Sequence, residues 1–194
     1  MPLVDCLKKI LKSSAWEEEE KRLLSNGHQV IKLEDKQSGM KIHIRTGDPI
    51  VAMRTERSRP KKKGERSGDA LKHLSCLESG FNKICDYLII FQFKANYYAV
   101  FIEMKETMTG QKGYEQLRRS LPILDYLISA CKIEYKINPI ISVKYVLIAE
   151  KSNIKLTKGP VRTTSPKSID QRYKGIMIRK FIGVQHFSVS KLAR

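Results

Sequence analysis

The sequence predicts an α/β domain in which a central mixed β-sheet is flanked by helices. With 194 residues, of which 41% are apolar and 29% charged, the chain has enough apolar material for one core. Two neighbouring runs rich in β-branched and aromatic residues, 85–93 and 97–105, predict long strands. Apolar residues at helical spacing follow, and then another short apolar run. Strands alternating with helices are typical of one mixed sheet, so we treat residues 1–194 as a single domain.

The N-terminal part predicts helices and then a hairpin. From Leu3 to about Asn26 the apolar residues recur at helical spacing, which indicates one or two helices ending at Asn26-Gly27. His28–Leu33 and Met40–Arg45 alternate well enough for two strands, and Lys36–Gly39 would form the turn between them.

A basic loop is expected over about residues 54–68. The run RTERSRPKKKGER is dense in Lys and Arg and is broken by Pro60 and Gly64, so it cannot pack into a core. A phosphate-contacting arm, a solvated loop and a nuclear-localisation patch explain it equally well. The next segment, Asp69–Leu77, fits a short helix or an irregular strand, and the sequence does not choose between them.

The clearest strands are CDYLIIFQF, Cys85–Phe93, and YYAVFIEMK, Tyr97–Lys105, which a short turn at Ala95-Asn96 would join into a hairpin. After Gly110 an apolar stripe predicts a helix, which Pro122 should kink or divide.

The C-terminal third predicts a strand, a loop and a β extension. Val143–Ala149 is the strand, and Asn153–Lys174, rich in Lys, Thr, Ser and Pro, indicates a long loop. Gly175–Val189 alternates again, and we expect one or two edge strands there as a C-terminal extension of the fold.

The charge and the cysteine content limit the kinds of partner and the cellular compartment that we expect. The chain has 37 Lys plus Arg against 20 Asp plus Glu, a net charge of +17, so polyanions are its natural partners. It has no apolar stretch able to span a bilayer and no secretory signal, so we expect a cytoplasmic protein (nuclear in a eukaryote) that is not in a membrane. The four cysteines are far apart, which favours reduced, mostly buried thiols: Cys6, Cys76, Cys85 and Cys131.

The hairpin can bring ionisable residues together. With a turn at Ala95-Asn96, Asp86 lies opposite Lys105 and Leu88 opposite Glu103, so both acids and the lysine share one face of the sheet. Two carboxylates on neighbouring strands can bind one hard cation such as Mg²⁺. A surface ion pair between Lys105 and Asp86, with Glu103 solvated, explains the same pattern, and by spacing alone it is the more frequent case.

The motifs ICDYLII, YAVFIEMK and GYEQLRRSL, in this order over about residues 85–149, resemble the core of the PD-(D/E)XK nuclease-like superfamily, the restriction-endonuclease-like fold. The resemblance implies that Asp86 and Glu103 hold Mg²⁺ or Mn²⁺ and that Lys105 assists the attacking water. It implies that Gln116, on the following helix, contacts the substrate or a metal-bound water.

The chain departs from the family pattern at two points. Cys85 replaces the proline that precedes the metal-binding aspartate, and the acidic residue that many members carry on their first helix is not identified. Glu17–Glu20 and Glu78 are candidates for it.

These features predict a magnesium- or manganese-dependent nuclease, either an endonuclease or an exonuclease. We expect it to hydrolyse phosphodiester bonds of DNA, with RNA as the second choice of substrate. The first alternative is a catalytically inactive nucleic-acid-binding module or basic adaptor on the same fold. Another is an RNA-binding protein that stacks bases on Tyr97 and Tyr98 or on Phe91 and Phe93. A homodimer, or a place in a larger complex, is compatible with all of them.

Overall fold

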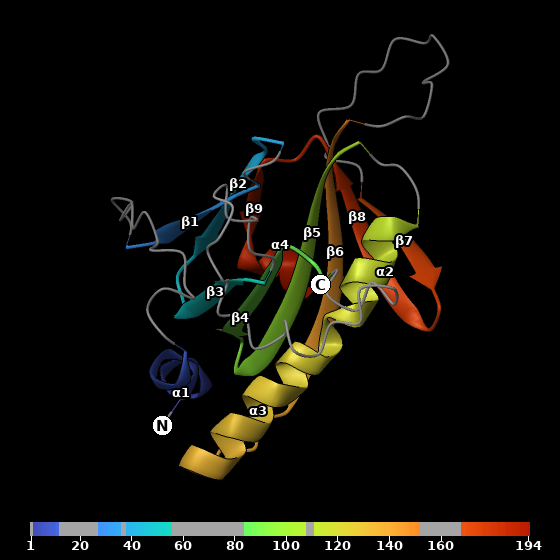
Figure 1. Cartoon of the computed structure of the whole chain (residues 1–194). Coiled ribbons are helices and arrows are strands. Elements are labelled where there is room, and N and C mark those ends of the chain that lie inside the picture. The colour runs from blue at the N-terminus through green and yellow to red at the C-terminus, as the bar shows by residue number, and fades with distance from the viewer. Residues whose placement is uncertain (1, 12–26, 36–37, 56–83, 108–110, 152–167) are drawn as a thin grey trace, which may run out of the picture.

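In the computed structural model, the described residues are 2–11, 27–35, 38–55, 84–107, 111–151 and 168–194. They form an α/β arrangement of mixed sheets flanked by helices (Figure 1). Most of the basic loop, the segment Asp69–Leu77 and the acidic run Glu17–Glu20 lie outside these residues.

Six strands of the described chain form the main sheet, in the order β3-β4-β5-β6-β8-β7. The antiparallel strands β3, β4 and β5 form a meander, β6 and β8 continue parallel to β5, and β7 closes the edge antiparallel to β8. The sheet is therefore mixed, as expected. The strand bounds are Ile50–Arg54 (β3), Tyr87–Phe93 (β4), Asn96–Thr107 (β5), Ile141–Lys151 (β6), Ser168–Tyr173 (β7) and Ile176–Ile182 (β8).

A smaller sheet packs against one face of the main sheet. Its strands are β1 (Gln29–Glu34), β2 (Lys41–Thr46) and β9 (His186–Ser188), and the short helix α4 (Val189–Ala193) follows β9. The antiparallel pairing of β1 with β2 confirms the N-terminal hairpin. Apolar side chains from both sheets and from α4 form one buried cluster between them.

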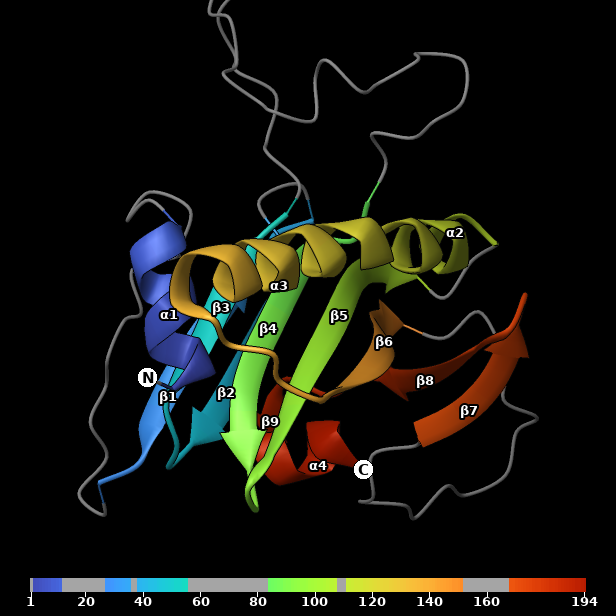
Figure 2. The same ribbon diagram turned by 90° about the horizontal axis from the view of Figure 1, so that it is seen from below.

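The other face of the main sheet is covered by helices α1 (Leu3–Ile10), α2 (Lys112–Arg119) and α3 (Leu121–Tyr135). Figure 2 shows these helices along one side of the sheet and α4 on the other. Pro122 lies in the first turn of α3, where its missing N–H leaves no hydrogen bond unmade, so the expected division of the helix at Pro122 is confirmed. In the described part of the chain, no helix is long and apolar enough to cross a bilayer.

Three strand predictions need correction. Ser168–Tyr173 is strand β7 and not loop, because Lys174 and Gly175 form a tight turn with φ of 43° and 89° that pairs it with β8. Its polar sequence, SIDQRY, has no apolar alternation to reveal it. Of the two strands in Gly175–Val189, β9 lies at the edge of the smaller sheet as expected, but β8 lies between β6 and β7 and is not an edge strand. Strand β3 was not expected, because its short, wholly apolar start lacks a strand period.

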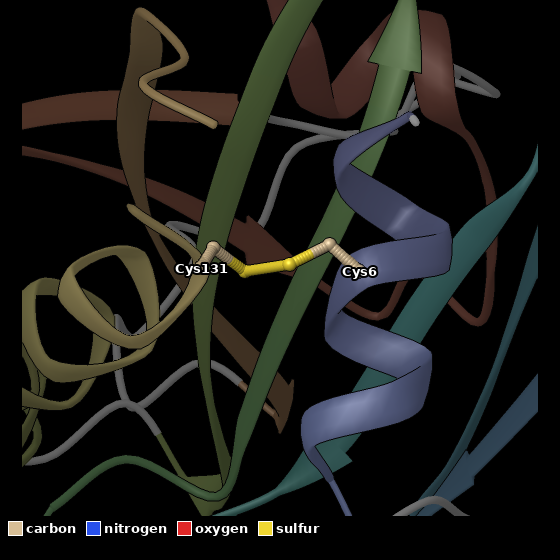
Figure 3. The surroundings of a disulfide bond; sticks show 2 residues. All are labelled: Cys6 and Cys131. Carbon is tan, nitrogen blue, oxygen red and sulfur yellow. A yellow bond between two sulfur atoms is a disulfide. The ribbon is translucent and has the colours of Figure 1, made fainter. Parts of the chain in front are cut away.

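The prediction that all cysteines are reduced is wrong for two of them. Cys6 on α1 and Cys131 on α3 form a disulfide, with 6.2 Å between their Cα atoms (Figure 3). The helices pack side by side on the sheet, and this proximity is invisible in a sequence where the cysteines stand 125 residues apart. Cys85 is a buried free thiol as expected, and Cys76 lies outside the described residues.

Candidate active site

The turn of the central hairpin lies one residue earlier in the chain than expected. Lys94 and Ala95 form the turn, with φ of 49° and 64°, and Phe93 pairs with Asn96. Leu88 therefore lies opposite Phe101 and not opposite Glu103. Moving a turn by one residue shifts each pairing by two positions, which preserves the face of every side chain.

The corrected register brings the two acids closer together. Tyr87 pairs with Ile102, so one step further along the hairpin Asp86 lies opposite Glu103, where Lys105 was expected. Glu103 and Lys105 share a face as alternate residues of β5. Asp86 precedes the first residue of β4, and the pairing reaches it only as a continuation of the register.

Glu103 is buried, and its partner is on the same strand. Its side chain has no solvent exposure, and Lys105 Nζ forms an ion pair with its Oε1. The lysine is 35% exposed, so it joins the buried carboxylate to the surface. The alternative with a solvated Glu103 is therefore wrong. A buried carboxylate is costly unless a cation compensates it, and here an ammonium group does so.

Asp86 is fixed at the start of β4 by main-chain hydrogen bonds. Its Oδ2 accepts a 2.6 Å hydrogen bond from the N–H of Met104, the residue after Glu103. Its carbonyl oxygen accepts another, of 2.9 Å, from the N–H of Thr55 at the end of β3. The carboxylate is thus anchored to the strand that carries Glu103 and Lys105.

The first turn of α2 packs directly on the ion pair. A Cβ added to Gly113 would lie 3.0 Å from Leu147 Cδ1, 3.4 Å from Glu103 Cγ and 3.8 Å from Lys105 Cε. Glycine therefore favours this close approach of helix to sheet, because a larger residue would push on the Leu147 side chain. The signal for this was present in the sequence as the glycine of GYEQLRRSL.

Gln116 is half-buried and acts on the backbone that precedes Asp86. Its Nε2 donates a 3.1 Å hydrogen bond to the carbonyl oxygen of Ile84. Ser120, which the sequence did not single out, accepts a 2.9 Å hydrogen bond from Cys85 N and donates one of 2.8 Å to Gln116 O. Helix α2 thus holds the chain at the entrance to β4.

Cys85, the residue before Asp86, is a buried thiol with little reactivity. Burial raises the pKa of its thiol to about 12, and the nearby carboxylates of Glu103 and Asp86 add to the effect. A thiol with such a pKa is neither a nucleophile nor a metal ligand near neutral pH.

The carboxylates near Glu103 suit a hard cation, but they are too few to complete its coordination by themselves. Asp86 and Glu103 offer carboxylate oxygens, which Mg²⁺ and Mn²⁺ prefer, and Asp86 is hydrogen-bonded to the residue that follows Glu103. Among the described residues, no group of three or more His, Cys, Asp or Glu side chains lies close enough to hold a metal ion. The candidates for a third acid, Glu17–Glu20 and Glu78, lie outside the described residues.

A further lysine lies in the same row of the sheet. Glu103 pairs with Leu147 on β6, and Leu147 pairs with Lys180 on β8, so Lys180 is two strands away, roughly 10 Å, on the same face. Its Nζ lies 4.9 Å from the centroid of the Tyr114 ring and donates to Gln171 Oε1.

Cations gather around Glu115 on the outer side of α2. Lys174 Nζ and Tyr173 Oη donate hydrogen bonds of 2.6 and 2.8 Å to its Oε1, and Arg118 lies 3.1 Å from its Oε2. These hydrogen bonds lower the pKa of Glu115 to about 2, Lys174 contributing most. Arg119 is a fourth neighbour, 3.9 Å away. Three cations share one carboxylate, so this surface keeps a positive charge.

The aromatic residues proposed to stack on bases are mostly packing residues. Phe91 has no exposure and stacks on Tyr98 at 5.6 Å, so its assignment to base stacking is wrong. Phe93, Tyr97 and Tyr98 are partly buried against the two apolar clusters.

Comparisons with protein-family models, with curated proteins and with solved structures find no match to this chain. Its function must therefore be argued from its own residues.

Proposed function

We propose that the protein is a metal-dependent nuclease of the PD-(D/E)XK kind, with Asp86 and Glu103 as metal ligands and Lys105 as the neighbouring cation. The fold supports this proposal by its order of elements: after α1 and the β1-β2 hairpin come the β3-β4-β5 meander, α2 with α3, and β6 parallel to β5. The same order is the one that the motif resemblance implies, with a helix after the Glu-x-Lys strand and then a further strand.

One observation carries the proposal: a carboxylate with no exposure is paired with a half-buried lysine, on the strand whose main chain holds a second carboxylate, that of Asp86. A surface ion pair explains the sequence pattern but not the burial, because a buried pair stabilises a fold less than apolar residues of the same volume would. Perturbed ionisable groups that stability does not explain are concentrated at functional sites.

Each group has a chemical task in phosphodiester hydrolysis. A divalent ion, when bound, polarises the phosphodiester and lowers the pKa of a bound water. Asp86 and Glu103 would hold that ion from opposed positions. Lys105, with its ammonium beside Glu103, would stabilise negative charge that grows on the phosphoryl oxygens. Gln116 would act as a positioning residue through Ile84, which keeps Asp86 at its place.

The substrate is a polyanion, and we propose DNA, with RNA second. The net charge of +17 favours phosphate backbones. Lys180 and the cluster of Lys174, Arg118 and Arg119 add positive charge beside the site, where backbone phosphates next to the cleaved bond would lie.

The test is cleavage of plasmid, linear duplex and single-stranded DNA with Mg²⁺ or Mn²⁺, and with EDTA as the metal-free condition. We expect Glu103→Gln and Lys105→Ala to lower the rate by about 10²–10³-fold or more, as for the loss of other charge-stabilising groups. Glu106→Gln is the matched control, because Glu106 lies on the same strand but is exposed and on the opposite face. It should retain the rate of the parent chain.

Cleavage that persists in both Glu103→Gln and Lys105→Ala would eliminate this site. Salt-sensitive DNA binding that survives EDTA, together with no cleavage in the parent chain, would instead identify the inactive binding module.

A further inference from the structure

Helix α3 carries an apolar stripe that faces away from the protein. Tyr126 and Ile133 are 72% and 75% exposed, which places them among the most exposed large apolar side chains in the described chain. Pro122 and the half-buried Ala130 continue the stripe at spacings of three and four residues, the period of one helix face, and the small exposed Ser129 lies on the same face.

The stripe lies opposite the face that α3 buries. Leu124, Leu127 and Cys131 face the main sheet and α1, and Cys131 is held there by its disulfide with Cys6. Two residues further along the helix from Leu124 and from Cys131 lie Tyr126 and Ile133, about 200° away around the axis. The covalent link to α1 fixes which face of α3 points to the sheet, so the stripe stays on the outer side.

We propose that this stripe is the contact surface between two copies of the chain, paired through antiparallel α3 helices about a two-fold axis. This inference is independent of the nuclease proposal, because the stripe is on the side of α3 that faces away from the sheet. A two-fold contact uses the same surface twice, so a stripe that pairs with itself needs self-complementary charges and shapes.

The flanking charges have this complementarity. Asp125 and Lys132 are both exposed and lie on the same edge of the stripe, seven residues apart. With the axis level with the midpoint between them, Asp125 of each copy lies beside Lys132 of the other. The same axis sets the large Tyr126 ring near the small Ala130 of the second copy, so the stripe can interdigitate.

The size of the surface predicts a weak, reversible dimer. A helix of 15 residues is about 22 Å long. One such pair buries less than the roughly 800 Å² per partner of a standard interface. We therefore expect dissociation in about the micromolar range, visible as a dependence of mass on concentration.

Sedimentation equilibrium of the full chain from about 1 to about 100 μM measures this self-association. We expect Ile133→Asp to shift the chain to monomer over the whole range, with an unchanged circular dichroism spectrum. Ile169→Asp is the matched control, because Ile169 is exposed on β7, away from α3, and should leave the dimer intact.

The antiparallel geometry has its own test. Asp125→Lys should weaken the dimer because like charges then meet, and the charge swap Asp125→Lys with Lys132→Asp should restore it. A parent chain that stays monomeric at every concentration overturns the proposal, and so does a dimer that Ile133→Asp leaves intact. A charge swap that fails to restore the dimer overturns the antiparallel pairing.

Discussion

The two faces of the main sheet differ in what they bury. Among the described residues, the face toward the smaller sheet buries an apolar cluster and the ring of Tyr87. The Tyr87 hydroxyl donates a 2.8 Å hydrogen bond to the carbonyl oxygen of Glu34 and accepts one from Arg54, and Thr46 is the buried polar residue of the smaller sheet. The face under the helices buries Glu103, together with Ser120 on the helix side. Strand β5 contributes to both, with Ile102 and Met104 on one face and Glu103 between them on the other.

The comparison shows that one sheet can bury an apolar layer on one face and an ion pair, that of the proposed site, on the other. A uniformly apolar face gains free energy in proportion to the area it buries and needs no special geometry. The helix-covered face bears the free-energy cost of a buried carboxylate. An ammonium group pairs with that carboxylate, a glycine lies close to it, and a disulfide links two of the covering helices. Changes on the apolar face should therefore alter stability alone. Changes on the helix-covered face should alter stability and the proposed cleavage activity.

The largest effect on stability should come from the disulfide. Among the described residues, it lies on the helix-covered face alone. Reduction, or Cys6→Ser with Cys131→Ser, should lower the free energy of unfolding by about 4 kcal/mol, because the link closes a long loop in the unfolded chain. Denaturant unfolding with and without reductant measures it. The Cys85→Ala variant should respond to reductant as the parent does, and equal unfolding midpoints with and without reductant would contradict the prediction.

On the apolar face, Ile102→Ala should cost about 3 kcal/mol, because the fully buried side chain leaves a cavity between the two sheets. The cleavage rate per folded molecule should stay at the parent value, since Ile102 points away from Glu103. Thermal unfolding and a cleavage assay on the same preparation check both parts. A rate that falls well beyond the loss of folded protein would show that the faces are coupled.

Lys105→Met and Glu103→Gln measure separately what each member of the buried ion pair contributes to stability. Lys105→Met should destabilise the protein by about 3 kcal/mol, because it leaves a buried carboxylate without its ammonium partner. Glu103→Gln removes the charge and leaves a lysine that reaches solvent, so its cost should be smaller, below about 1.5 kcal/mol. Urea unfolding of both variants measures the difference, and an equal or reversed order would refute the assigned asymmetry.

The smallest effect should come from Glu115, at the surface of the helix layer. Its pKa of about 2 lies below the ordinary value of 4.5, so its ion pairs stabilise the fold above about pH 4.5 and are lost as the pH falls toward 2. Glu115→Gln should be less stable than the parent near pH 7 by under about 1 kcal/mol, because such exposed pairs are weak. The difference should shrink at acid pH and at high salt, and a difference that grows on acidification would refute it.

Much of the candidate site followed from sequence because side-chain alternation is local. The ion pair of Glu103 with Lys105, two residues apart on β5, was within reach of the sequence despite the wrong turn position, since a register shift of two residues preserves the face of each side chain. The separation of α2 from α3 at Pro122 was equally predictable from the missing N–H of proline. The burial of Glu103 was not, because it depends on helix α2 approaching through Gly113.

By itself, the sequence determined the charge, the two central strands, the faces of their residues and the helix that follows them, because these depend on composition and on periods of two and about 3.6 residues. Only the tertiary structure decided which distant segments meet. It joined Cys6 to Cys131, set β7 beside β8, and stacked His43 on His186 across two strands far apart in the chain. Such contacts arise from packing the whole chain around two apolar clusters, and no local pattern records them.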